Sequence, residues 1–182
     1  VWSVSRSEAE RLMAMEAPEF LAEAGRRFGP ELGVFTRMGK RSAYPLRLVR
    51  AAQDTHQRVV ILGNAAHAIH PVGAQGFNLG CRDVAVLAEL LAASGADPGT
   101  PEILRRYSEW RRPDHEQTIG LSEGLTRLFA NTSPVASSLR SRGLIAHALL
   151  PPLRRRLAAG AMGYRGRIPR LAKGRPLTGV ET

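Results

Sequence analysis

The residues best suited to chemistry lie between Arg58 and Asp83, in the stretch RVVILGNAAHAIHPVGAQGFNLGCRD. The apolar run from Val59 to Leu62 predicts a buried strand, and a helical period that begins near Gln75 predicts a helix. Glycines in the connecting loop let a flat ligand approach the backbone closely, because no Cβ stands in the way. The first N–H groups of the helix lack intrahelical partners and lie at the positive end of its dipole. The loop therefore predicts a site for a cofactor or an anion.

Three motifs follow one another in this stretch: Gly63-Asn64-Ala65-Ala66-His67, His70-Pro71 and Gln75-Gly76-x-Asn78-x-Gly80-x-x-Asp83. Together they resemble the second flavin fingerprint of the class A flavoprotein monooxygenases. Three features are more narrowly similar to the hydroxylases of ubiquinone biosynthesis that act on polyprenylated methoxyphenols. They are the Asn that replaces Asp in the first motif, the continuation Phe77-Asn78-Leu79-Gly80, and the upstream Tyr44-Pro45-Leu46.

The resemblance implies that the loop and the start of the helix bind FAD. Asn64 matches the residue that hydrogen-bonds the ribityl chain, and Pro71 belongs to the loop beside the isoalloxazine. Asn78 and the helix N-terminus match the groups at the pyrimidine end, where N–H groups would stabilise the reduced ring. The candidate cofactor-binding residues are Gly63, Asn64, Pro71, Gly73, Ala74, Gln75, Gly76, Phe77 and Asn78.

One position departs from the family pattern. The family usually has Ala-Gly before Gln-Gly, whereas this chain has Gly73-Ala74. If Ala74 adopts a positive φ, the backbone is strained there. We therefore expect the loop to differ locally or to bind flavin less well.

The resemblance further implies an FAD-dependent aromatic hydroxylase, with NAD(P)H as reductant and O₂ and a polyprenylated phenol as substrates. The oxidant in such enzymes is a flavin C4a-hydroperoxide, so we predict no catalytic side chain. Neither an initiator Met nor the family's N-terminal GxGxxG fingerprint occurs in the sequence. We therefore expect the C-terminal portion of a longer enzyme, and expect the isolated chain to bind FAD weakly or not at all and to be inactive.

The predicted fold class is α/β, as the C-terminal part of a Rossmann-like FAD/NAD(P)-binding flavoprotein monooxygenase. Residues 1–57 are interpreted as a partial antiparallel substrate-binding sheet with two short helices. Residues 58–95 are interpreted as the C-terminal part of the FAD-binding domain. Residues 96–182 are interpreted as a helical C-terminal region with a basic tail.

Local patterns place the elements of the first of these regions. Ser7-x-x-Glu10 is a capping-box pattern that predicts a short helix, and a second helix is predicted from Pro18 to Arg27. The runs Leu32–Met38 and Ala43–Val49 predict a hairpin.

Further along, the spacing of the apolar residues predicts the buried faces of the helices. The helix that follows Gln75 is expected to bury Phe77, Cys81, Val84, Leu87 (or Ala88) and Leu91. Tyr107 and Trp110 are expected in the core of the next helix. Pro113 predicts an interruption there, so that Asp114, His115 and Glu116 form an acidic first turn. Two more helices are predicted near residues 134–150 and 152–162.

Two histidines and one charged pair allow more than one interpretation. His67 and His70 have a spacing that metal ligands can have, but no third ligand lies nearby in sequence and the chain has one cysteine. We predict no metal, and interpret His67 as a buried or loop-ordering side chain. Arg82 and Asp83 fit either a capping or surface pair or a role in the flavin site.

Charge is concentrated at one end. Of the formal net charge of +10, the segment Ser137–Thr182 contributes +9, from ten basic residues and one acid. Such a tail fits a solvated face with a loose end, an anionic lipid surface or a nucleic acid. We predict an anionic membrane surface and no nucleic acid, since no nucleic-acid-reading motif accompanies the arginines.

One cysteine and the lack of a long apolar run predict a cytoplasmic protein without a membrane span. The apolar substrate tail that the resemblance implies, together with the basic end, predicts peripheral attachment to the membrane. Other proteins of ubiquinone biosynthesis are possible partners. Two alternatives to the proposed hydroxylase stay open: a non-enzymatic basic module for membrane docking or assembly, and a hydroxylase of the same family with another phenolic substrate.

Overall fold

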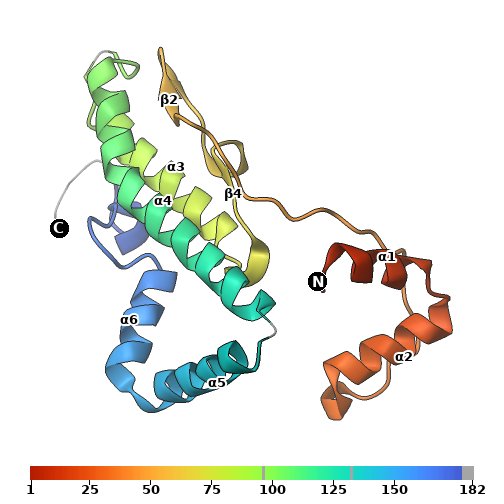
Figure 1. The fold of residues 1–182 in the computed structure, drawn as a ribbon. Coiled ribbons are helices and arrows are strands. Elements are labelled where there is room, and N and C mark those ends of the chain that lie inside the picture. The colour runs from red at the N-terminus through yellow and green to blue at the C-terminus, as the bar shows by residue number, and fades with distance from the viewer. Residues whose placement is uncertain (96, 132, 178–182) are drawn as a thin grey trace. The chain divides into compact units, whose positions relative to one another are not determined.

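The computed structural model describes residues 1–95, 97–131 and 133–177, and the chain divides into two compact units, Val1–Leu46 and Arg47–Thr182. We call these the N-terminal and C-terminal units; their elements are labelled in Figure 1. All candidate cofactor residues belong to the C-terminal unit. The domain boundaries expected after residues 57 and 95 stay predictions.

The N-terminal unit begins with α1, Arg6–Ala14. The Ser5 hydroxyl caps this helix, because it accepts a hydrogen bond from the Glu8 N–H at 3.3 Å. The helix itself is as predicted, but the capping box at Ser7 and Glu10 is wrong. Serine is a favoured N-cap residue, and Ser5 is the serine whose hydroxyl accepts from an N–H of the first turn.

The second helix of this unit, α2, spans Ala17–Phe28 and agrees with the prediction. Pro18 lies in its first turn, where the missing N–H costs nothing. Gly29, with φ 91°, ends it, and a short 3₁₀ turn, η1, follows over Pro30–Leu32. Glycine adopts this left-handed backbone without strain.

The hairpin predicted over Leu32–Met38 and Ala43–Val49 is wrong. Residues 33–48 form no strand in the structure. The Arg41 guanidinium instead donates to the carbonyl oxygens of Leu12 and Met15, each at 2.6 Å. This segment is therefore held by a side chain that binds the end of a helix, and its own backbone groups face solvent.

Two very short antiparallel ladders open the C-terminal unit (Figure 1). β1, Val49–Arg50, pairs with β4, His67–Ala68. β2, Thr55–His56, pairs with β3, Val59–Val60. The buried strand predicted over Val59–Leu62 is shorter than expected. Only Val59–Val60 is a strand, and it pairs with β2 alone, so its other edge has no partner strand among the described residues. No parallel pair occurs among the described strands, so the Rossmann-like sheet stays a prediction.

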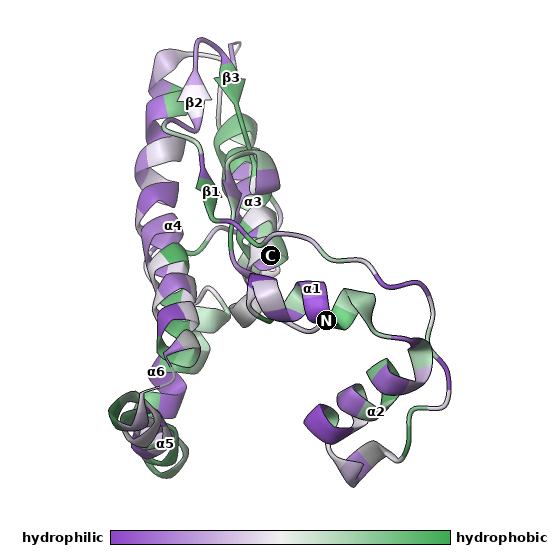
Figure 2. Cartoon of the chain, turned by 45° about the vertical axis from the view of Figure 1, so that its right-hand side comes forward, coloured by the Kyte–Doolittle hydropathy of each residue, from purple (hydrophilic) through white to green (hydrophobic). Residues whose placement is uncertain are grey.

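Two helices that lie side by side form the body of this unit: α3, Gly76–Ala92, and α4, Pro101–Ala130 (Figure 1). Their contact contains the apolar core, onto which Val60 of β3 and Leu62 after it also pack. Figure 2 shows the hydrophobic colour of β3 and of much of α3. The core residues are Val86, Leu90, Ile103 and Tyr107, with Val60, Leu62, Leu87 and Trp110 packed against them.

The face that α3 buries differs from the expected one. Phe77 is 81% exposed, and Cys81, Val84 and Leu91 are exposed as well. The buried stripe is instead Leu79, Arg82, Asp83, Ala85, Val86 and Leu90. The helix carries two apolar stripes, and the one that is buried contains Arg82 and Asp83, which is typical of a solvent-exposed face. It is buried because its charges find partners on α4.

The helix α4 continues through Pro113, so the predicted interruption is wrong. Proline removes one helical hydrogen bond, but residues of α4 on both sides of Pro113, such as Tyr107 and His115, contact α3 and hold the two flanking halves in one helix. Asp114, His115 and Glu116 are therefore mid-helix residues, and His115 points into the interior.

The remaining helices are α5, Pro134–Leu149, and α6, Pro151–Ala161, as predicted. Beyond them the chain is irregular apart from the turn η4, Leu171–Lys173. Among the described residues, no helix combines the length and the apolar character needed to cross a bilayer.

The irregular segment after α6 binds across both long helices and is not a loose end. The Trp110 ring donates through Nε1 to the Arg167 carbonyl at 2.8 Å, and the Arg167 guanidinium stacks 3.5 Å from that ring. On α3, Glu89 accepts from the Arg170 N–H at 2.6 Å. We call residues 163–175 the C-terminal strap.

Candidate functional site

The candidate cofactor residues form one continuous surface from the end of β3 to the start of α3. Gly63, with φ 55°, opens a 3₁₀ turn, η2, over Gly63–Ala65. After β4, a second 3₁₀ turn, η3, covers Pro71–Gly73, and α3 begins two residues later. The structure thus brings all nine candidate residues into a single turn-and-helix segment, which we call the crossover.

Several crossover side chains are open to a ligand. Asn64 and Phe77 are exposed, as are Pro71, Ala74 and Asn78. The glycines and Gln75 are half-buried. Gly80 brings the crossover and the helix into close contact, since a Cβ there would lie 3.3 Å from the Gly63 Cα.

The N-terminus of α3 offers unpaired donors. The cap residue Gln75 makes no side-chain capping bond, and the first bond of the helix runs from the Leu79 N–H to the Gln75 carbonyl at 2.8 Å. The N–H groups of residues 76–78 precede that bond and point out of the helix end. Gln75 Oε1 is buried and lacks a hydrogen-bond partner among the described residues.

These groups fit a flavin. Its pyrimidine ring presents carbonyl oxygens that accept from N–H groups and one ring N–H that an amide oxygen can accept, and reduction adds negative charge to this end. The helix N-terminus stabilises such charge, and Gln75 Oε1 is an acceptor that needs a donor. The residues predicted for this role thus have the chemistry that the role requires.

Ala74 does adopt the conformation considered from its sequence, with φ 49° and ψ 30°. Alanine is strained in this left-handed region, whereas glycine is not. We expect Ala74→Gly to leave the free energy of unfolding unchanged or to raise it by up to about 1 kcal/mol, because lost strain offsets the extra freedom of the unfolded chain. Urea denaturation measures this. Ala52→Gly, in a loop residue with negative φ, should lower the same quantity, and an equal loss in both variants would contradict the strain.

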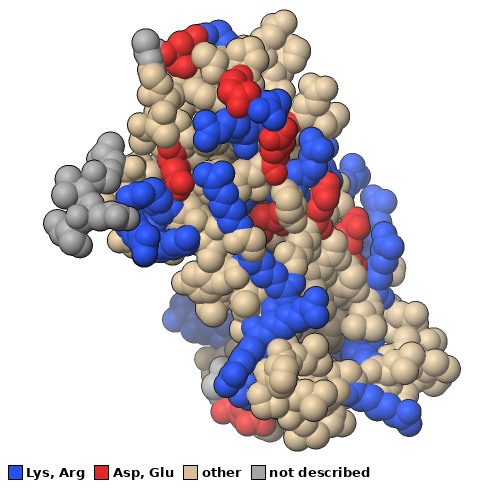
Figure 3. Space-filling view, turned by 90° about the vertical axis from the view of Figure 1, so that its left-hand side faces the viewer, with Lys and Arg blue, Asp and Glu red and all other residues tan. Residues whose placement is uncertain are grey.

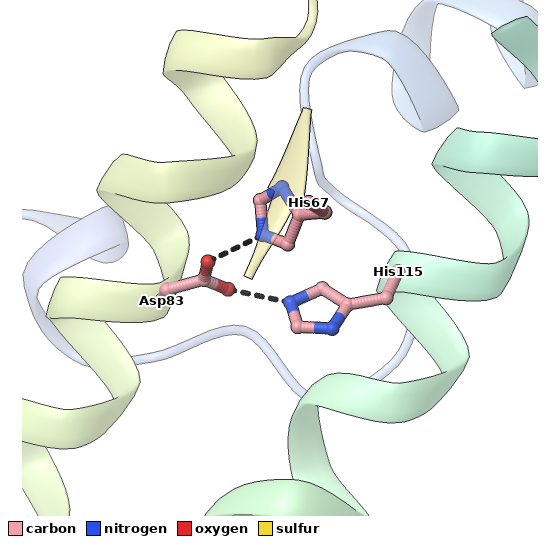
Figure 4. A group of neighbouring side chains, drawn as sticks. All are labelled: His67, Asp83 and His115. Carbon is pink, nitrogen blue, oxygen red and sulfur yellow. Dashed lines mark hydrogen bonds and ion pairs between the residues drawn. The ribbon is translucent and has the colours of Figure 1, made fainter. Parts of the chain in front are cut away.

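Behind the crossover lies a buried charged group centred on Asp83 (Figure 4). Its side chain is fully buried. Oδ2 accepts from His67 Nε2 at 2.7 Å, and Oδ1 accepts from His115 Nε2, also at 2.7 Å. The Gly63 N–H lies 3.4 Å from Oδ2. One carboxylate from α3 therefore holds β4, the first turn of the crossover and α4 together.

Two arginines balance the acids of this group, the buried Asp83 and the half-buried Asp114. Arg111 Nε donates to Asp83 at 2.7 Å, and its Nη1 lies 2.7 Å from Asp114. Arg82 Nε also donates to Asp114, at 2.7 Å. Gly163 of the C-terminal strap covers Arg82 so closely that a Cβ there would lie 2.6 Å from the Arg82 Cδ.

The pKa values follow from these contacts. Burial alone would raise the pKa of Asp83, but hydrogen bonds from His115 and His67 and the charge of Arg111 outweigh it and hold that pKa far below its usual range. Burial would likewise raise the pKa of Asp114, but hydrogen bonds and charge from Arg82 and Arg111 outweigh burial and lower that pKa. An ionised Asp83 only accepts, so each histidine donates to it from Nε2.

By residue type, His67, Asp83 and His115 could also ligate a metal, since their ligand atoms lie within 4.8 Å of one another. However, Arg111 touches the same carboxylate, and its fixed positive charge opposes a divalent cation there. We therefore interpret the three residues as a hydrogen-bonded group. We call this group, with Arg111, Arg82 and Asp114, the Asp83 network.

Sequence reasoning missed most of the Asp83 network. The interpretation of Arg82 and Asp83 as a capping or surface pair is wrong, because both are buried and bind partners on α4. Asp114 and His115 were assigned to a solvated first turn. The available signal was the spacing of Arg111 and His115, which places both on one helical face together with Tyr107 and Leu104. His67 is buried, as predicted.

The comparisons with known proteins agree with the crossover. The profile of the FAD binding domain family matches residues 1–122. The chain therefore belongs to the FAD binding domain family, which confirms the resemblance on which the site residues were chosen.

Among curated relatives, the chain is 40% identical to ubiquinone hydroxylase UbiL of Rhodospirillum rubrum, over 97% of this chain and 43% of the relative. It is 30% identical to 3-demethoxyubiquinol 3-hydroxylase of Escherichia coli, over 90% of this chain and 42% of the relative. It is 34% identical to ubiquinone biosynthesis monooxygenase COQ6 of Dictyostelium discoideum, over 59% and 22%. The chain thus spans less than half the length of these relatives. No solved structure matches it.

Proposed function

We propose that this chain supplies one side of the flavin site of an FAD-dependent hydroxylase in ubiquinone biosynthesis, with a polyprenylated methoxyphenol as substrate. The crossover is the observation that carries the proposal. It combines free N–H groups at the α3 N-terminus with an unpaired acceptor, Gln75 Oε1, in a chain of the FAD binding domain family. The names of the relatives support the pathway and the reaction class.

Bound FAD would supply the activation of O₂, and NAD(P)H would supply the electrons. The residues of this chain would bind and orient. The exposed Asn64 amide oxygen would accept from a ribityl hydroxyl, and the α3 N-terminus would stabilise negative charge at the pyrimidine end. Gln75 Oε1 would accept from the ring N–H.

The Asp83 network would keep this surface in shape without touching the cofactor. It fixes the crossover at its start, through the Gly63 N–H and His67. Ser122 of α4 fixes it further along, by donating to the His70 carbonyl at 3.0 Å. A rigid first turn keeps the Asn64 amide and the helix N-terminus at a fixed separation, which is what preorganised binding requires.

Asn64→Ala in the full-length protein tests the proposal. Because Asn64 is exposed, the fold should tolerate the change, while the loss of one hydrogen bond should weaken FAD binding about tenfold. Flavin fluorescence titration of the apoprotein measures it. Gln117→Ala, which removes an exposed amide from α4, is the matched control and should leave FAD affinity unchanged.

Equal FAD affinity in the Asn64→Ala variant and the wild type would count against the role assigned to Asn64. Tight stoichiometric FAD uptake by residues 1–182 alone would contradict the expectation that this chain supplies only part of the site. The substrate is tested separately, by analysis of the products formed from polyprenylated phenols. A different phenolic product would keep the flavin site and replace the substrate.

A further inference from the structure

The two helices α5 and α6 carry an exposed apolar surface. Neither helix buries a residue, although isolated helices of this length are marginal in water and need a packed face to persist. Figure 1 shows them meeting at a sharp corner, where Pro151 and Pro152 begin α6. Leu149 and Leu150, before these prolines, are 73% and 53% exposed. The other large exposed apolar residues of the pair are Val135, Leu139, Leu144, Ile145, Leu153 and Leu157.

Positive charge lies directly beside this apolar corner. Arg154, Arg155 and Arg156 follow it in the first turns of α6, and all three side chains are exposed. No aspartate or glutamate occurs between Glu123 and Glu181 in the sequence. On the face drawn in Figure 3, most acidic side chains lie in the upper half, while basic ones continue into the lower half. The corner thus has no negative charge of its own chain nearby in sequence.

This combination selects among the surfaces that could cover the corner. A second copy would bring the same arginines and no acids, so like charges would meet across a two-fold contact. A nucleic acid would pair with the arginines but leave the leucines in water. An anionic bilayer satisfies both, because the leucines enter the boundary between head groups and acyl chains while the arginines bind the head groups.

We propose that the α5–α6 corner is a docking surface for anionic phospholipid membranes, with Leu149, Leu150 and Leu153 as the inserted residues and Arg154, Arg155 and Arg156 as the head-group contacts. From composition, the whole basic segment Ser137–Thr182 was a candidate for membrane binding. The proposal assigns that binding to one corner of the fold. It also separates the corner from the part of the C-terminal strap that binds the long helices, where Arg167 stacks on Trp110 of α4 and the Arg170 N–H binds Glu89 of α3. It does not depend on flavin chemistry.

Co-sedimentation of the full-length protein with vesicles tests the proposal. We expect binding to vesicles of equal parts phosphatidylcholine and phosphatidylglycerol, weaker binding in high salt, and little binding to pure phosphatidylcholine. Arg154→Gln with Arg155→Gln should reduce binding about 30-fold in low salt, since each arginine near an anionic surface contributes about 1 kcal/mol. The control pair Arg106→Gln and Arg112→Gln removes the same charge from exposed positions on α4 and should change binding much less.

Leu149→Ser with Leu150→Ser separates insertion from charge. It should weaken binding at both salt concentrations while leaving the circular dichroism spectrum and FAD content unchanged. Equal binding losses in the α6 and α4 arginine pairs would overturn the proposal, because net charge and not the corner would then decide binding. A dimer that these serines dissociate, or retention on duplex DNA in place of vesicles, would also overturn it.

Discussion

Asp83→Asn lowers the free energy of unfolding of the C-terminal unit by about 3–5 kcal/mol, the range measured when one partner of a buried ion pair is removed. In the wild type, one buried and one half-buried carboxylate, Asp83 and Asp114, face two buried guanidinium groups. The substitution leaves Arg82 and Arg111 with Asp114 as their only carboxylate in the Asp83 network. The amide also presents an N–H to at least one histidine that already donates, so a hydrogen bond becomes a clash of donors.

Urea denaturation measures this loss. Trp110 packs against the core of the C-terminal unit, so its fluorescence follows that unit once Trp2 is replaced by Phe in every variant. Asp97→Asn is the control, because Asp97 also pairs with an arginine, accepting two hydrogen bonds from Arg58, but on the surface. Exposed pairs contribute little, so a similar loss in both variants would mean that the Asp83 network does not hold the unit together.

A second large effect is expected in acid. The pKa of Asp83 is far lower in the folded state than in the unfolded chain, so the unfolded state binds more protons once the pH falls below about 5. The stability that Asp83 contributes is therefore fully present near neutral pH. It is lost progressively as the pH falls toward the folded-state pKa. The lowered pKa of Asp114 acts with the same sign.

The difference in unfolding free energy between the wild type and Asp83→Asn should accordingly shrink as the pH is lowered from about 7 to about 3. The reason is that protonation removes in the wild type the charge that the substitution has already removed. Urea titrations at several pH values measure the difference. Glu116→Gln, which replaces an exposed acid on α4, should give a small difference at every pH. A wild-type advantage over Asp83→Asn that is constant with pH would contradict the assigned ionisation of Asp83.

Local signals predicted the crossover well. The glycines, the onset of α3 near Gln75 and the unusual position of Ala74 all depend on neighbours within a few residues, and the sequence contains those neighbours. The helices α2, α5 and α6 follow equally from prolines and apolar spacing nearby. Even the strain at Ala74 could be anticipated, because a reversed Gly-Ala order leaves the left-handed position to a residue with a Cβ.

Long-range pairing explains the failures. Asp83 and His115 meet because two helices lie side by side, and nothing within a few residues of either signals the other. The packing of α3 against α4 also determines which stripe of α3 is buried, and it keeps α4 helical through Pro113. The predicted hairpin failed for the opposite reason: strand-like composition between Leu32 and Val49 has no effect where the backbone finds no partner strand in the structure.

The C-terminal strap has a consequence for how this unit matures on the ribosome. Trp110, Glu89 and Arg82 are synthesised well before the residues that cover them, Arg167, Arg170 and Gly163. Until the later residues leave the exit tunnel, the outer sides of α3 and α4 stay wet and the buried arginine is open to water. Native packing of the two helices is therefore completed only when the strap closes over them.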